Sequence, residues 1–93
     1  MLSIPSTSKE YLHIPVTGGT LSTPVDIAVI AATAEEPTSG DWKPADVWDG
    51  AVAKLLIGPG GTVPLADGVY RVWVRVTATP EIPVLRSGLL EIT

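Results

Sequence analysis

Four residue types are missing from this 93-residue chain: cysteine, phenylalanine, asparagine and glutamine. Because there is no cysteine, the chain cannot be an extracellular fold that depends on disulfide bonds. Because there is no asparagine, it has no site for N-linked glycosylation. The single histidine, His13, has no cysteine or second histidine with which to hold a metal ion or relay a proton. We therefore expect no catalytic residue, no metal site and no cofactor.

Basic residues and long apolar runs are also scarce. Six lysines and arginines stand against ten acidic residues, a net charge of −4, and this disfavours nucleic acid as a partner because phosphates require a basic surface. The longest apolar stretch, residues 27–34, is far shorter than the ~20 residues that span a bilayer. Residues 1–12 lack the basic start and apolar middle of a signal peptide. We expect no membrane partner, and synthesis in a cytoplasm.

The residues that are abundant are typical of short strands joined by turns. Nine glycines and nine prolines are too many for long helices, and valine, isoleucine and threonine together number 28. A chain of this length forms one domain with one modest core. The segments that we expect to be strands are residues 9–17, 24–33, 50–58, 62–65, 66–77 and 87–93.

The remaining segments predict an arm, a turn and two connections. Residues 1–8 predict an extended N-terminal arm, and residues 17–20 predict a turn. Residues 34–49 form a long connection, from which we expect one tryptophan to fold back as a lid over the end of the core. Residues 78–86 predict a proline-interrupted crossover. The fold predicted for residues 9–93 is all-β, a single antiparallel β-sandwich of about seven short strands.

The clearest alternation lies in residues 66–77. Tyr70, Val72, Val74 and Val76 fall on one face of the predicted strand. Tyr70 also follows a turn of the form Leu-x-x-Gly, which is the pattern of a tyrosine corner. In immunoglobulin-like sandwiches this tyrosine hydroxyl bonds to the backbone a few residues upstream. The pattern therefore favours an immunoglobulin-like sandwich, and the alternative is an ordinary core tyrosine beside a turn.

Five carboxylates lie close together in the long connection, and they are the residues Glu35, Glu36, Asp41, Asp46 and Asp49. Calcium binds such groups, but their spacing matches no EF-hand loop. Loop aspartates more often close turns by accepting backbone hydrogen bonds. We therefore expect these side chains to be structural.

Three residues on the other face of the 66–77 strand, Arg71, Trp73 and Arg75, predict an outward stripe. Arginine and tryptophan dominate binding hot spots, so the stripe is a candidate partner-binding surface, together with Trp42 and Trp48. If the 34–49 connection covers it, the same residues are internal packing, with cation–π contacts of their own. The residues alone leave both interpretations open.

Several segments together resemble one known family. They are residues 39–42 through Trp48, the turn at 56–60, the run at 67–76, and residues 80–84 followed by Gly88 and Ile92. In this order, across nearly the whole chain, they are similar to the LtfC-like β-sandwich proteins encoded among the virion structural genes of tailed phages that infect actinobacteria.

The resemblance implies a non-enzymatic virion structural protein made in the host cytoplasm. Its implied partners are other virion proteins, such as the major capsid protein or a tail protein, and a homo-oligomer is compatible with it. The implied position is capsid decoration, the head–tail connection or the tail. The alternative function is a carbohydrate- or cell-surface-binding module, in which Trp42 and Trp48 would form a platform that stacks on a sugar.

Overall fold

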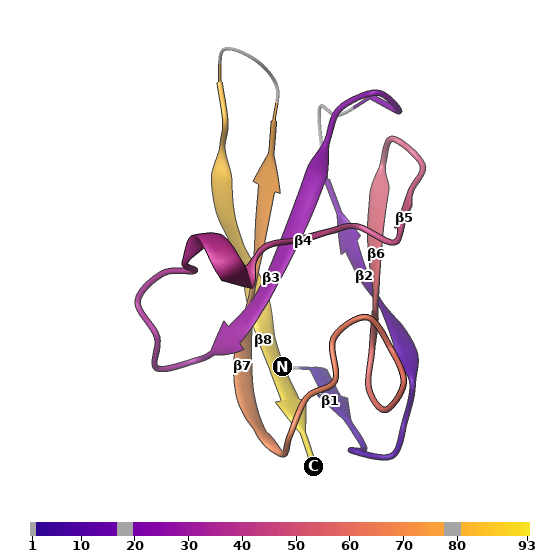
Figure 1. Ribbon diagram of the computed structural model, residues 1–93, viewed down its shortest axis with the longest axis vertical. Helices are drawn as coiled ribbons and strands as arrows, with labels where there is room; N and C mark the ends of the chain where they lie inside the picture. Colours follow the sequence, from indigo (N-terminus) through magenta and orange to yellow (C-terminus); the bar gives the residue numbers. More distant parts are fainter. Residues whose placement is uncertain (1, 17–19, 78–80) are drawn as a thin grey trace.

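Two β-sheets pack face to face in the computed structural model, which describes residues 2–16, 20–77 and 81–93 (Figure 1). The larger sheet has the strand order β1-β8-β7-β3-β4, and the smaller has the order β2-β6-β5. The strands are β1 Leu2–Ile4, β2 Glu10–Pro15, β3 Val25–Ala31, β4 Lys43–Pro44, β5 Val47–Trp48, β6 Val52–Ile57, β7 Gly68–Val76 and β8 Val84–Ile92. The prediction of a two-layered, sandwich-like all-β fold is confirmed.

One short helical turn accompanies the strands in the described part of the chain. It is the 3₁₀ turn η1, Ser39–Asp41. No helix of the described residues is long and apolar enough to cross a membrane.

The core lies between the two sheets and follows the alternation of the strands. On β7 the residues that face it are Val72, Val74 and Val76, as their period of two predicts. The opposite sheet contributes Leu55 and Ile57, whose side chains are almost completely buried. The full set of buried core residues is Ile4, Leu12, Ile14, Val25, Ile27, Ala53, Leu55, Ile57, Val72, Val74, Val76, Leu90 and Ile92.

The start of the chain is part of the larger sheet. β1 pairs in parallel with β8, and its Ile4, which is only 5% exposed, joins the core. The segment expected to be an arm is therefore extended, but its first residues form a strand. All other strand pairs are antiparallel, so the larger sheet is mixed where a purely antiparallel one was expected.

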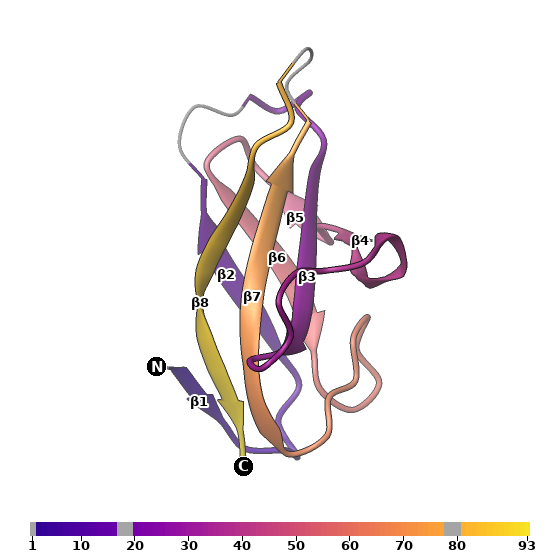
Figure 2. The ribbon, with the colours of Figure 1, turned by 90° about the vertical axis from the view of Figure 1, so that its left-hand side faces the viewer.

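The prediction of a crossover over residues 78–86 was wrong in its described part. β7 and β8 are neighbours that pair along their whole length, so the chain makes a hairpin, and β8 begins at Val84 (Figure 2). Pro83 precedes the strand, where proline is tolerated, and its carbonyl accepts a hydrogen bond from the Val76 amide at 3.0 Å. Residues 78–80, and residues 17–19 of the turn expected at 17–20, lie outside the described residues.

The expected strand at residues 62–65 was also wrong. Only Val63 pairs, through an isolated bridge to Ile57. Pro64 cannot donate to a ladder, and the Thr62 hydroxyl binds the carboxylate of Asp46 at 2.9 Å instead. The segment is a loop that packs Val63 and Leu65 against the core.

Tyr70 makes the hydrogen bond expected of a tyrosine corner. Its hydroxyl donates to the carbonyl oxygen of Ala66 at 2.7 Å, across the turn that leads into β7. The ring packs against the core at the same time. This bond fixes the β6–β7 connection to the start of β7.

We predict that Tyr70→Phe destabilises the fold by about 1 kcal/mol, the net contribution of one hydrogen bond. The measurement is chemical denaturation at neutral pH, with Tyr11→Phe on the exposed face of β2 as the matched control. The control should leave the free energy of unfolding unchanged. Equal stability of Tyr70→Phe and the natural protein would mean that the corner bond contributes nothing.

Candidate interaction surfaces

Figure 2 presents the outer face of the larger sheet to the viewer. The expected arginine and tryptophan side chains lie on this face. Trp73 lies there with Ala28 and Ile30 of β3 in a second, smaller apolar cluster. Trp42, which directly follows η1, packs on this cluster. Trp73 is consequently only 8% exposed, and its indole nitrogen is buried without a hydrogen-bond partner among the described residues.

Arg75 is held within the molecule by two contacts. Its guanidinium donates to the Asp26 carboxylate on β3, at 2.9 Å from Nη2 and 3.2 Å from Nε. It also stacks on the Trp42 ring, with its central carbon 4.7 Å from the ring centroid. The side chains of Arg75 and Asp26 are both partly buried. The charge of Arg75 is therefore largely compensated by contacts within the molecule.

These contacts bear on the two interpretations that the sequence leaves open for the stripe. Trp73 is covered, and Arg75 joins the covering residue to the sheet, so the interpretation as internal packing applies to both. Trp42 does fold back from the long connection, but onto the outer face of the sheet and not over the end of the core. Arg71 remains half-buried on the same face, beside Leu89 of β8.

Trp48 lies in a different part of the molecule. It belongs to β5 in the smaller sheet, packs against the main core, and donates from its indole nitrogen to the Thr20 carbonyl at 2.8 Å. Trp42 and Trp48 therefore do not form one platform. The geometry removes the arrangement on which the sugar-binding alternative depends.

The aspartates of the long connection close turns, as expected. Asp49 accepts the backbone amides of Val52 and Ala51 at 2.7 and 2.9 Å, and these bonds lower the pKa of its carboxyl group, Val52 having the larger effect. The amide and hydroxyl of Thr38 lower the pKa of Asp41 in the same way. Because the folded pKa values are depressed, the stabilisation exists above the ordinary pKa and disappears as the pH falls through the lowered one.

Asp46 uses its carboxylate to join three segments. It accepts the Leu56 amide of β6 at 2.7 Å and the Thr62 hydroxyl of the following loop. His13 lies exposed on β2, opposite Lys54. In the described ranges, no three residues of the types that ligate metals gather as they would around an ion.

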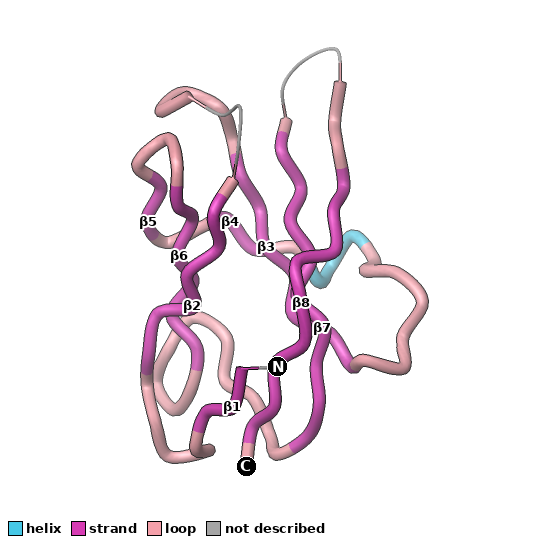
Figure 3. The backbone as a smooth tube through the Cα atoms, turned by 180° about the vertical axis from the view of Figure 1, so that it is seen from behind, coloured by secondary structure: helices cyan, strands magenta, loops and turns pink. Residues whose placement is uncertain are grey.

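A surface that the sequence analysis missed lies along the first half of β8. Ile82, Val84 and Leu85 are 56%, 47% and 56% exposed, although they are large and apolar. β8 pairs with β7 along its full length, but β1 covers its other edge only at Leu90–Ile92 (Figures 2 and 3). Within the described residues, the edge from Val84 to Leu89 therefore has no neighbouring strand. We call residues 82–87 the β8 edge.

The backbone of the β8 edge offers hydrogen-bonding groups to the outside. The Thr77 amide, just after β7, donates to the Pro24 carbonyl, just before β3. By alternation, the backbone N–H and C=O groups of Arg75 and Trp73 on β7 also point toward β3. Their partners on β8, Val84 and Arg86, consequently form non-hydrogen-bonded pairs with β7 and point their own amides and carbonyls away from it. The β8 edge is thus able to accept a further strand.

The strands at the ends of the two sheets are short or carry an outward-facing proline. On β2 the Val16 amide donates to the Ala51 carbonyl of β6, so the backbone of Pro15 faces outward and that edge lacks a donor at this position. β1, β4 and β5 are two or three residues long, and β4 includes Pro44. Pro83, by contrast, faces β7 and leaves the outer donors of β8 intact. Of the two strands that border the open side of the sandwich, β2 and β8, only β8 has no proline whose backbone faces outward.

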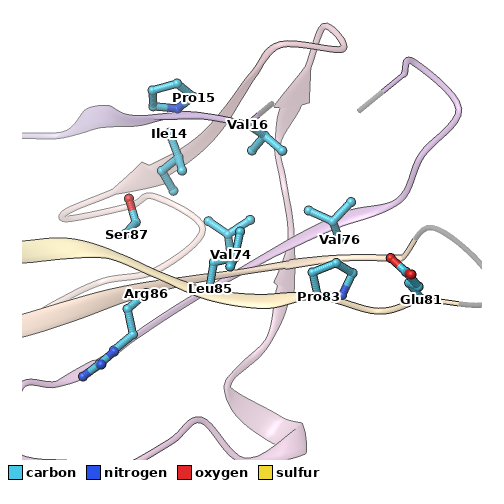
Figure 4. Close-up of a pocket in the computed structure, with 10 residues that line it drawn as sticks. All are labelled: Ile14, Pro15, Val16, Val74, Val76, Glu81, Pro83, Leu85, Arg86 and Ser87. Atoms are coloured by element: carbon cyan, nitrogen blue, oxygen red, sulfur yellow. The ribbon is translucent and has the colours of Figure 1, made fainter. Parts of the chain in front are cut away.

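An apolar groove of about 340 Å³ lies between the β8 edge and β2. Figure 4 shows Ile14 and Val16 on one side of it and Val74, Val76 and Leu85 on the other, while the guanidinium of Arg86 points away. A smaller hollow, which shares Ile14 and Ser87 with the groove, continues it toward Leu2. The groove exists because the two sheets are open on the side where β2 is an edge strand and the first half of β8 extends beyond β1.

No protein-family model matches this chain, and no curated protein matches it at a significant level.

We predict that Trp42→Ala exposes Trp73 and destabilises the fold by roughly 2 kcal/mol, because a large half-buried side chain is removed from the outer cluster. The measurement combines urea denaturation with the tryptophan emission spectrum, which should shift to longer wavelength. Trp42→Phe is the control, and it should retain most of the stability. An unshifted spectrum in Trp42→Ala would mean that Trp42 does not shield Trp73.

Proposed function

We propose that this chain is a non-enzymatic virion structural protein that binds other virion proteins through the β8 edge. The virion assignment comes from the sequence resemblance to the LtfC-like group. The observation that favours an assembly role is the exposed apolar strand edge, with outward backbone donors and acceptors and no proline among them. A protein that must stay unpaired in solution would not leave this edge open.

The contact that we propose is strand addition. In this mode of recognition a partner strand forms backbone hydrogen bonds with an open sheet edge, and its alternate side chains enter pockets beside it. The β8 edge supplies the backbone groups, and the groove beside Leu85 supplies the apolar pocket. On a symmetric particle many weak contacts act together, so that one contact need not be tight.

We also propose that the sandwich is immunoglobulin-like. The support is the hydrogen bond from the Tyr70 hydroxyl to the Ala66 carbonyl, at the entrance to the next-to-last strand. A fold of this kind places rigid strand edges and loops on the surface, where they are available to a partner.

The test is the copy number of the chain in purified phage particles, measured by quantitative mass spectrometry against the major capsid protein. On the order of hundreds of copies would place it on the capsid, and about a dozen would place it at the neck or tail. Complete absence from particles would contradict the virion assignment.

The same particles test the surface. We expect Leu85→Lys, which puts a charge at the mouth of the groove, to reduce occupancy at least about tenfold by opposing apolar burial. Leu21→Lys is the matched control, since Leu21 is 74% exposed and lies outside the β8 edge. Normal occupancy of Leu85→Lys, with a folded chain by circular dichroism, would exclude the β8 edge as the contact.

A further inference from the structure

We infer that the strand that pairs with the β8 edge is the β8 edge of a second copy of this chain, in a two-fold symmetric dimer. The inference rests on the use of this edge that the proposed function assigns. It adds the identity of the partner, which no part of that proposal specifies.

The edge is complementary to itself in its backbone. The backbone N–H and C=O groups of Val84 and Arg86 point outward. Those of Ile82 do so as well, because Ile82 precedes Pro83, whose backbone faces β7, and because a residue before proline is held extended. An antiparallel arrangement centred on Val84 places Val84 opposite Val84 and each Arg86 opposite the Ile82 of the other copy. All of these residues carry an N–H, so about six inter-chain hydrogen bonds can form. No proline falls at a donor position.

The side chains of the edge match as well. Residues that are opposite each other share a face, so the two Val84 side chains meet on the outer face. On the inner face each Leu85 lies beside the Pro83 of the other copy, at the mouth of the groove. The three exposed apolar residues Ile82, Val84 and Leu85 are thereby covered together. A symmetric contact of this type closes on itself and covers the β8 edge of both copies.

Charge complementarity supports a second copy over an unrelated strand. Glu36 and Val84 line the same hollow of about 210 Å³ on the outer face. Arg86 lies on that face too, as the partner of Trp73 in the sheet register. Within the described residues, neither Glu36 nor Arg86 takes part in an ion pair.

In the two-fold arrangement, Arg86 of one copy is diagonal to Val84 of the other, and therefore adjacent to the hollow that contains the second copy's Glu36. The relation holds in both directions, so the dimer contains two equivalent Arg86–Glu36 contacts. The same chain thus supplies the cation and the anion, as an isologous interface requires.

The experiment is sedimentation equilibrium of the full chain over a range of concentrations. We expect a monomer–dimer equilibrium for the natural protein. Val84→Pro removes both central hydrogen bonds and should raise the dissociation constant roughly thirtyfold. Val84→Thr keeps the N–H and the branched shape, and should dimerise nearly as well. Both variants keep the β7–β8 hydrogen bonds, because the Val84 amide faces outward, and thermal unfolding checks that both are folded.

Charge exchange tests the identity of the partner. Arg86→Glu alone and Glu36→Arg alone each place two like charges together twice in the dimer, and each should raise the dissociation constant roughly tenfold. The double variant restores opposite charges and should dimerise like the natural protein. Weakening by both single changes without rescue in the double variant would overturn the proposed register.

The results also separate this inference from the proposed function. A natural protein that stays monomeric up to about 1 mM, where contacts of even about 4 kcal/mol would be seen, overturns the second copy as the partner. If Leu85→Lys nevertheless fails to enter particles, the edge binds a strand of another virion protein and the proposed function stands. If the dimer forms as expected but Leu85→Lys enters particles normally, the dimer stands and the proposed contact with the particle fails.

Discussion

The alternation of side chains along β7 is the constraint on which both faces of the molecule depend. Its inward residues Val72, Val74 and Val76 lie in the core between the sheets. Its outward residue Trp73 sits beneath Trp42, and Arg75 joins Trp42 to the sheet. Because the period of a strand is two, a slip by one residue would exchange these two sets and expose the whole core face. The β7 pairing with β3 and β8 therefore determines which surfaces remain for contact.

The β8 edge can accept a further strand because no proline there faces outward. A proline removes a hydrogen-bond donor from a sheet edge only where its nitrogen points away from the sheet, as at Pro15. At Pro83 the missing donor faces the neighbouring strand within the sheet, so the outer edge keeps its hydrogen-bonding groups. The sequence around the two prolines is similar. The proline nitrogen points out of the sheet at one site and toward the neighbouring strand at the other, so only the first removes a donor from an edge. The groove beside β8 opens on the same side, where β2 and the first half of β8 each have a neighbouring strand on only one side.

Strong alternation made the fold class, the 66–77 strand and the Tyr70 contact predictable from the sequence. Leu2–Ile4 could not be predicted, because three residues have too little periodicity and their pairing with β8 joins the two ends of the chain. The β7–β8 hairpin was missed because the two prolines of residues 78–86 indicate that a strand ends, but not whether the chain then turns back beside it or crosses over. Burial of Trp73 depended on where the 34–49 connection lies, which composition does not specify. The β8 edge is a property of sheet order, and no local motif marks it.

Backbone amide hydrogen exchange at Val84, compared between the dilute chain and the assembled state, tests the central claim most directly. We expect the Val84 amide to exchange rapidly in the dilute chain, while the Leu85 amide, which faces β7, is protected. On assembly the Val84 amide should become protected as well, because a second strand then accepts its hydrogen bond. A Val84 amide that exchanges at the same rate in both states would contradict strand addition at this edge.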